Sequence, residues 1–231
     1  MIPGPSRSVE LMESDLRELI ATVQSSHLRR LLTSLLGPES ATWTAFREAP
    51  AAKHYHQGYR HGLLDHSLAV AQAVGALSTV FGGIDRDLAV TGALVHDIGK
   101  LDAYEFVDDE TIEMTRLGRL HGEIALGHYR IRSEIEQLKG FPAELEEALL
   151  HIILSHHGSL EHGSPVVPAT REATLVHMAD NLSSKLGGYD RLQASLTDDA
   201  EWSAYDRGLG TCAYFGPTGS RPDASAVRAA A

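Results

Sequence analysis

Apolar residues recur every three or four positions over most of the chain, which is the spacing of an amphipathic helix. The longest such run covers residues 13–36 and ends at Gly37-Pro38. Residues 103–115 are mainly polar and predict a connection, and no stretch alternates convincingly between apolar and polar positions. The pattern therefore predicts an all-α protein. Further helices are predicted over 63–80, 88–98, 120–139, 143–156 and 172–185.

The same pattern predicts a single helical bundle between two irregular ends. Residues 1–12 contain two prolines and a glycine and predict a flexible N-terminal arm. Residues 13–215 carry the helical runs and predict one domain, which a chain of 231 residues can accommodate. Residues 216–231 are rich in Gly, Pro, Ser and Ala and predict a disordered tail. Trp202 and Tyr205 are expected to serve in packing.

Composition limits the expected partners and compartment. A formal net charge of -11 argues against a broad basic surface, so long duplex nucleic acid is not expected as a partner. No signal peptide is evident and no uninterrupted apolar segment is long enough to span a bilayer, so no membrane partner is expected. The single cysteine, Cys212, fits a reducing compartment, and the expected location is cytoplasmic.

Candidate chemistry centres on the pair His96-Asp97, at the end of an apolar helix and within the stretch LVHDIGK. A buried imidazole and carboxylate are costly without a partner, and a divalent metal is an economical one. Imidazole and carboxylate without thiolate suit Zn, Mn, Fe or Co. Other metal-ligating side chains stand in similarly apolar surroundings, and these are His66, His156, His157 and Asp180.

These residues carry a resemblance to a known family. His66, the pair His96-Asp97 thirty residues later, and Asp180 match the H…HD…D signature of the HD-domain metal-dependent phosphohydrolases. The chain is more similar still to the YhaM-type subgroup, also called the CBF1 type. Its members are 3′-5′ exoribonucleases whose helical HD domain usually follows an OB-fold. The matching motifs lie at 49–53, 62–66, 96–100, 154–158, 163–165 and 180–182.

The resemblance implies hydrolysis of a phosphoester with one or two divalent ions, whether Mn, Fe, Co, Ni or Zn. For one ion the implied ligands are His66, His96, Asp97 and Asp180. For a second ion the implied ligands are Glu123, His156 and His157, with Asp97 as a bridge. A water between the ions, its pKa lowered towards about 7, would attack phosphorus.

The resemblance also implies roles outside the ligand set. Asp97 and Lys100 are the implied catalytic residues, because the Lys100 ammonium would neutralise a phosphate oxygen. Lys53 and His56, together with Lys100, are the implied substrate-binding residues. The expected substrate is a nucleotide or a short single-stranded RNA.

Two departures from the subgroup change the expected activity. No OB-fold, which normally supplies a groove for single strands, precedes the HD-like sequence, so processive degradation of long RNA is not expected. The gapless match places Glu123 where the subgroup has a second-metal histidine. Glutamate can ligate Mn or Fe, so the site can persist with an altered metal preference. Glu123 can equally be a solvated helix residue.

Other interpretations of the same residues stay open. Imidazoles at 156–157 can stabilise a helix C-terminus, but at least one of them is expected to be a ligand, and which one stays open. Lys100 can likewise stabilise the C-terminus of its own helix. His177 precedes Asp180 by three residues and is interpreted as a core or supporting residue. As alternatives in function, the ligand set fits a mixed-valent di-iron oxygenase, as in some HD proteins, or a nucleotide-binding HD module without turnover.

Overall fold

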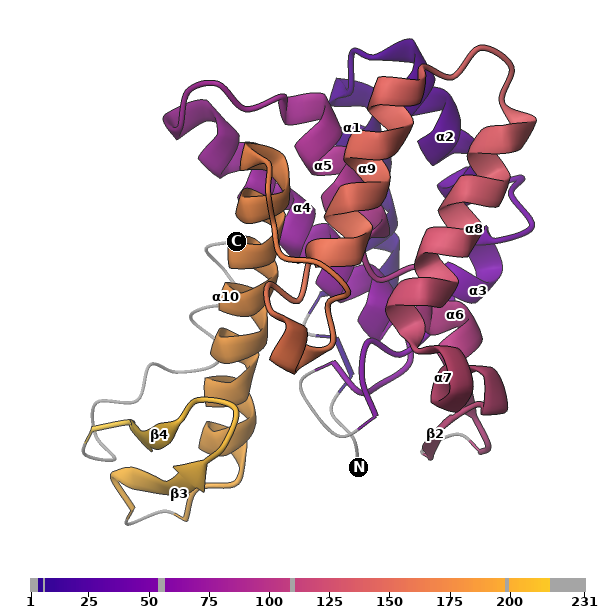
Figure 1. The fold of residues 1–231 in the computed structure, drawn as a ribbon. Coiled ribbons are helices and arrows are strands. Elements are labelled where there is room, and N and C mark those ends of the chain that lie inside the picture. Colours follow the sequence, from indigo (N-terminus) through magenta and orange to yellow (C-terminus); the bar gives the residue numbers. More distant parts are fainter. Residues whose placement is uncertain (1–3, 6, 54–56, 109–110, 198–199, 217–231) are drawn as a thin grey trace. The chain divides into compact units, whose positions relative to one another are not determined.

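Helices dominate the computed structural model and the strands in its described part are short, which confirms the predicted all-α class (Figure 1). The described residues are 4–5, 7–53, 57–108, 111–197 and 200–216. The α-helices are α1 (Val9–Thr22), α2 (Ser26–Leu36), α3 (Trp43–Glu48), α4 (Gly62–Val80), α5 (Arg86–Val95), α6 (Lys100–Ala103), α7 (Arg116–His121), α8 (Glu123–Gln137), α9 (Ala143–Ser155) and α10 (Arg171–Ala194), with a 3-10 turn, η1 (Leu160–His162). The strands pair as two antiparallel hairpins, β1 (Tyr104–Phe106) with β2 (Ile112–Met114), and β3 (Trp202–Asp206) with β4 (Thr211–Tyr214).

The chain forms two compact units, Met1–Asn181 and Leu182–Ala231, where the sequence predicts one domain over 13–215. The boundary falls within α10, so the second unit contains the end of that helix and the β3–β4 hairpin. Inside this unit an ion pair between Arg191 and Asp206 ties the helix to the hairpin. Every predicted site residue that the structure describes belongs to the first unit.

The first helix begins earlier than the sequence predicts. α1 starts at Val9, so the last residues of the predicted arm over 1–12 are helical. The Ser8 hydroxyl accepts a hydrogen bond from the backbone N–H of Leu11 (3.2 Å) and thereby caps the helix. Met12 is fully buried in the core, which anchors this first turn.

The apolar run over 13–36 is two helices and not one. The carboxylate of Asp87 accepts hydrogen bonds from the backbone amides of Gln24 and Ser25, both at 2.7 Å, in the break between α1 and α2. Both helices bury their apolar sides in the same core. The spacing of apolar residues therefore continues through the break, and the side chain that stabilises the break lies far away in the sequence.

Two segments between residues 103 and 139 also differ from their predictions. Gly122 has a φ of 75°, a conformation that favours glycine, and divides the helix predicted over 120–139 into α7 and α8. Residues 103–115, predicted as a connection, contain the β1–β2 hairpin, in which Phe106 lies opposite Ile112. Strands of three residues are too short for alternation to reveal them.

The C-terminal part of the described chain is more regular than predicted. α10 continues through Gly187-Gly188 to Ala194, because packing supports the helix there: the Leu209 side chain lies 3.4 Å from where a Cβ of Gly188 would be. The irregular segment predicted after it is the β3–β4 hairpin. Trp202 and Tyr205 on this hairpin are 58% and 66% exposed, and the Trp202 ring packs against that of Tyr214 on the paired strand, with 4.7 Å between the ring centroids.

The central helix of the first unit is α4, which packs against α1, α3 and α5. By length and composition alone it could cross a membrane, and it is the one helix in the described part of the chain that meets this test. Half of that window is buried inside the protein, as in a core helix. His66 on α4 is only 4% exposed and stands among buried leucines, so α4 carries a polar side chain into the core.

Candidate metal centre

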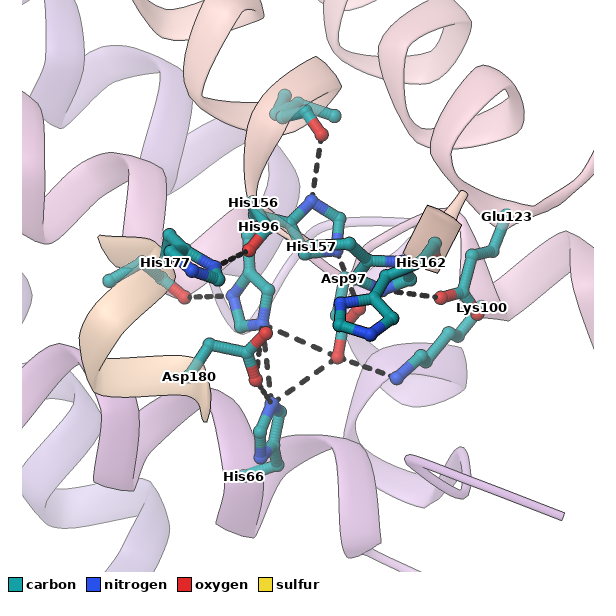
Figure 2. A network of polar contacts seen from close by, with 12 residues as sticks. His66, His96, Asp97, Lys100, Glu123, His156, His157, His162, His177 and Asp180 are labelled. Carbon is teal, nitrogen blue, oxygen red and sulfur yellow. Dashed lines mark hydrogen bonds and ion pairs between the residues drawn. The ribbon is translucent and has the colours of Figure 1, made fainter. Parts of the chain in front are cut away.

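The seven predicted ligand residues, which lie far apart in the sequence, converge in the first unit (Figure 2). They come from α4, the turn after α5, the start of α8, the end of α9 and the middle of α10. Within each of two clusters, all ligand atoms lie within 4.8 Å of one another. The first cluster is His66, His96 and Asp180, and the second cluster is Asp97, Glu123, His156 and His157.

The carboxylate of Asp97 lies between the two clusters. Its Oδ2 is 3.4 Å from the Nε2 atoms of His66 and His96, which belong to the first cluster. Its Oδ1 is 3.5 Å from Nε2 of His156, in the second cluster. The two oxygens thus face different sets of imidazoles, which is the arrangement of a carboxylate that can bridge two cations.

The first cluster is compact. Nε2 of His66 lies 3.2 Å from Nε2 of His96 and 3.1 Å from Oδ1 of Asp180. The side chains of His66 and His96 are 5% and 0% exposed, and that of Asp180 is 14% exposed. Two imidazole nitrogens and a carboxylate oxygen directed at one another form a donor set that Zn, Mn, Fe and Co accept.

Backbone carbonyls fix the imidazole tautomers. Nδ1 of His96 donates to the carbonyl of Ala93, and Nδ1 of His156 donates to the carbonyl of Ile153, each at 2.7 Å. Both acceptors precede the histidine by three residues at the end of a helix, where carbonyls lack the usual helical partner. Because Nδ1 is committed to a carbonyl, Nε2 is the ring nitrogen that faces the centre, as in a metal-ligating imidazole.

The second cluster has a more open side. Nε2 of His157 lies 3.3 Å from Oε1 of Glu123, and the two side chains are 28% and 17% exposed. Nδ1 of His157 donates to the carbonyl of His162 (2.9 Å), so this imidazole also presents Nε2. Glu123 therefore points into the cluster, and the solvated-residue alternative for it does not fit the geometry.

A cation fits the polar atoms that these side chains leave unsatisfied. Oδ1 of Asp97 and Nε2 of His156 are buried and have no hydrogen-bond partner among the described residues. Such atoms are costly in a protein interior unless something coordinates them. Their position between the two clusters makes the donor set suitable for one or two divalent ions.

The electrostatics of the centre favour positive charge. Burial opposes protonation of His96, but the carboxylate of Asp97 raises the pKa of His96 to about 9. Burial likewise favours neutral carboxyl groups, yet the ammonium of Lys100 and the imidazole of His96 hold the pKa of Asp97 well below its usual range. The imidazole of His66 has the same effect on the pKa of Asp180. The carboxylates are therefore ionised at neutral pH.

Lys100 lies against the shared carboxylate. Its Nζ is 2.7 Å from Oδ2 of Asp97, and its side chain is 13% exposed. Burial opposes the charged form, but the carboxylates of Asp97 and Glu123 raise the pKa of Lys100 above its ordinary value. Lys100 therefore remains positively charged at the centre. Its ion pair with the carboxylate that lies between the two clusters goes beyond the alternative role of stabilising a helix end.

The predicted substrate-binding residues are placed unequally. Lys53 is partly buried in the segment before α4, and no hydrogen bond or ion pair among the described residues joins it to the clusters. His56 lies outside the described residues. Of the two residues of this group that the structure describes, Lys100 is the one brought to the centre.

Sequence reasoning missed one residue near the centre and gave no definite role to another. Tyr104 directly follows α6, and burial together with the carboxylate of Glu123 raises the pKa of the Tyr104 phenol. The sequence indicates only a core or supporting role for His177, and in the structure its Nδ1 donates to the carbonyl of His156 (2.8 Å; Figure 2). Its spacing from Asp180, three residues on one helix, was the available signal, because such residues share a face.

With this centre in place, comparison with known proteins assigns the family. The family model named HD domain matches residues 63–185, which is more than half of the chain. The protein belongs to the HD-domain family, as its motifs predicted. The matched region contains all seven residues of the two clusters.

The chain is also similar to particular members. It is 31% identical over 182 residues to the 3′-5′ exoribonuclease YhaM of Shouchella clausii (strain KSM-K16), an alignment that covers 78% of this chain and 54% of that protein. It is 32% identical over 188 residues to the 3′-5′ exoribonuclease YhaM of Geobacillus sp. (strain WCH70), covering 81% and 56%. The chain thus spans about half the length of these curated relatives. No solved structure matches it.

Proposed function

We propose that this protein is a metal-dependent phosphoester hydrolase that acts on short single-stranded RNA, from its 3′ end, or on nucleotide phosphoesters. One observation carries the proposal: two clusters of imidazoles and carboxylates meet at the single carboxylate of Asp97. The two similar proteins are both named 3′-5′ exoribonucleases, which supports the choice of RNA.

The residues divide the work of holding cations. His66, His96 and Asp180 would hold one ion, and Glu123, His156 and His157 would hold another, with Asp97 shared. Divalent ions bound in this way would activate a water for attack on phosphorus and withdraw charge from the phosphoryl oxygens. The absence of thiolates from the clusters favours Mn, Fe, Co, Ni or Zn in an imidazole–carboxylate environment.

Lys100 supplies the remaining positive charge. Two divalent ions against the carboxylates of Asp97, Glu123 and Asp180 leave a net charge of about +1. The ammonium of Lys100 raises this to about +2 and can contact a phosphoryl oxygen of the substrate, where negative charge accumulates. Its fixed position beside Asp97 means that this contact needs little reorganisation.

Charge also limits the substrate. A net charge of -11 disfavours binding along a long polyanion, because the protein offers no excess of basic residues to replace counterions. The free energy of binding would then come from the end of the RNA at the centre. We place the protein in the cytoplasm, where short RNA and nucleotides are available and its single cysteine stays reduced.

The test joins metal analysis to a product screen. Purified protein would be analysed for bound metal and incubated with 5′-labelled short RNA, mononucleotides and cyclic nucleotides in Mn, Co, Ni, Zn or Mg. We expect stepwise shortening of the RNA from its 3′ end, or release of phosphate from a nucleotide, only with metal. Asp97→Ala should abolish the reaction, whereas Asp190→Ala, which removes an exposed carboxylate of α10, should not.

Two results would contradict the proposal. Two irons per chain with oxygen uptake and no phosphoester cleavage would establish oxygenase chemistry on the same ligands. Nucleotide binding without turnover in every metal would establish a binding module.

A further inference from the structure

One imidazole outside the two clusters contacts the backbone that joins two of their members. His177, on α10, donates from Nδ1 to the carbonyl oxygen of His156 at 2.8 Å (Figure 2). That carbonyl belongs to the peptide that connects His156 to His157. The orientation of this one peptide plane decides how the two consecutive imidazoles are directed relative to each other, because few torsions separate them.

In the described part of the chain, no backbone N–H donates to the carbonyl of His156. α9 ends at Ser155, and the next backbone bond, from the N–H of Gly158 to the carbonyl of Ser155 (2.8 Å), closes a turn. Carbonyls at a helix end need a partner from elsewhere in the fold. His177 provides it, and thereby holds the turn that directs both imidazoles of the second cluster.

The turn is shaped to receive this imidazole. Gly158 has a φ of 80°, and a Cβ there would lie 2.1 Å from Cε1 and 2.3 Å from Nε2 of His177. Any side chain at this position would overlap the ring. The His177 ring therefore occupies the space that a side chain at Gly158 would need, and it packs against the backbone of the turn.

α10 also supplies Asp180 to the first cluster. His177 and Asp180 are three residues apart, so they lie on the same face of the helix. Any shift of α10 along or away from the turn would move the carboxylate of Asp180 and the His156–His157 peptide relative to each other. The bond from His177 resists that shift.

We propose that His177 is a positioning residue of the metal centre: it holds the peptide joining His156 and His157, and so aligns the second cluster with the helix that carries Asp180. The inference rests on the proposed metal-dependent function but concerns metal binding and not turnover. Supporting residues of this kind typically change metal affinity 10- to 100-fold when they are lost.

The experiment compares two substitutions in the full chain. His177→Leu introduces an apolar side chain of similar bulk and removes the hydrogen-bond donor. His177→Asn places an amide donor at nearly the position of Nδ1. Each variant and the wild type would be titrated with Co(II), with affinity from calorimetry and ligand geometry from the visible absorption bands.

We expect the wild type to bind two equivalents. His177→Leu should weaken one of them by about 10-fold or more and alter its absorption, while the other keeps its affinity. His177→Asn should recover most of the loss. Far-ultraviolet circular dichroism of the metal-free variants checks the fold, and His177→Gln, whose amide is one methylene farther out, replaces the leucine variant if that does not fold.

The outcomes separate this inference from the proposed function. A wild type that binds no Co(II) overturns both. A wild type that binds two ions, with His177→Leu unchanged at both equivalents or weakened equally at both, overturns the role of His177 and leaves the proposed function standing.

Discussion

At the scale of single residues, the side chain that organises the centre is Asp97. It is 3% exposed; its Oδ2 contacts His96 and the ammonium of Lys100, and its Oδ1 faces another imidazole, that of His156. A carboxylate in such a place would be too costly to bury without cations close to both oxygens. Lys100 neutralises one side, and Oδ1, without a hydrogen-bond partner, is directed at His156 of the second cluster.

Replacing Lys100 should separate catalysis from metal binding. We expect Lys100→Gln to lower kcat by roughly 100-fold, the usual effect of removing one group that stabilises transition-state charge, while bound metal stays near the wild-type content. Steady-state kinetics and metal analysis on the same preparation would measure both. Lys139→Gln, at an exposed lysine after α8, is the matched control and should change neither. Loss of metal together with activity would contradict this role.

The raised pKa of His96 predicts how the chelator-treated protein responds to pH. Burial opposes its charged form, but Asp97 raises the pKa to about 9 against about 6.5 in an unfolded chain. A raised pKa stabilises the fold fully below the unfolded value, and this contribution is lost as pH rises through about 9. The Tm should therefore fall between about pH 6.5 and 9 more steeply in the wild type than in His96→Gln. If Tm falls equally with pH in the wild type and in His96→Gln, the raised pKa of His96 is contradicted.

At the scale of elements, the turn after α5 and the start of α8 approach each other at backbone distance. A Cβ on Gly99 would lie 2.0 Å from the carbonyl oxygen of Glu123 and 2.4 Å from the amide nitrogen of Gly127. This contact brings Asp97, two residues before Gly99, close to Glu123 at the first turn of α8. The second cluster therefore depends on a glycine that carries no chemistry itself.

Enlarging that glycine should damage both stability and the second cluster. We expect Gly99→Ala to lower the free energy of unfolding by about 2 kcal/mol, within the range for an overfilled core site, because the three atoms nearest to the added methyl belong to the backbone and cannot rotate away. It should also weaken metal binding, since α8 must move away. Urea unfolding and metal titration measure the two effects. Gly82→Ala, where nothing lies within 4 Å, should show neither.

At the scale of the whole molecule, the clusters connect segments from most of the first unit. Ligand residues come from α4, the turn after α5, α8, the end of α9 and α10. Cations bound there would link these segments to one another, and they would do so only in the folded state, because only folding brings the ligand residues together. Stability should therefore depend on metal concentration.

Removing metal should lower the stability of the protein as a whole. At a free metal concentration 100 times Kd, binding adds about 2.7 kcal/mol to the free energy of unfolding. We expect the Tm to fall on treatment with a chelator and to recover on addition of Mn or Co. Asp97→Ala should show no such shift in either direction. A wild-type Tm that ignores both chelator and metal would contradict metal binding at the clusters.

The sequence by itself determined the helical class, the family and the identity of the side chains that converge. Helical periodicity is a local property, so α4 and α9 could be placed almost to the residue. The residues of the HD signature stand in apolar stretches, where a polar side chain needs a partner, and this too can be seen without a structure. That these residues bind metal stays a prediction.

The tertiary structure decided what depends on contacts between distant segments. Asp87 creates the break between α1 and α2 from far along the chain, and no local pattern contains that information. The division of the Asp97 oxygens between two clusters, and the hold of His177 on the peptide after His156, likewise arise from helix packing. Residue types limit the chemistry that a site can perform, but only packing sets the distances on which that chemistry depends.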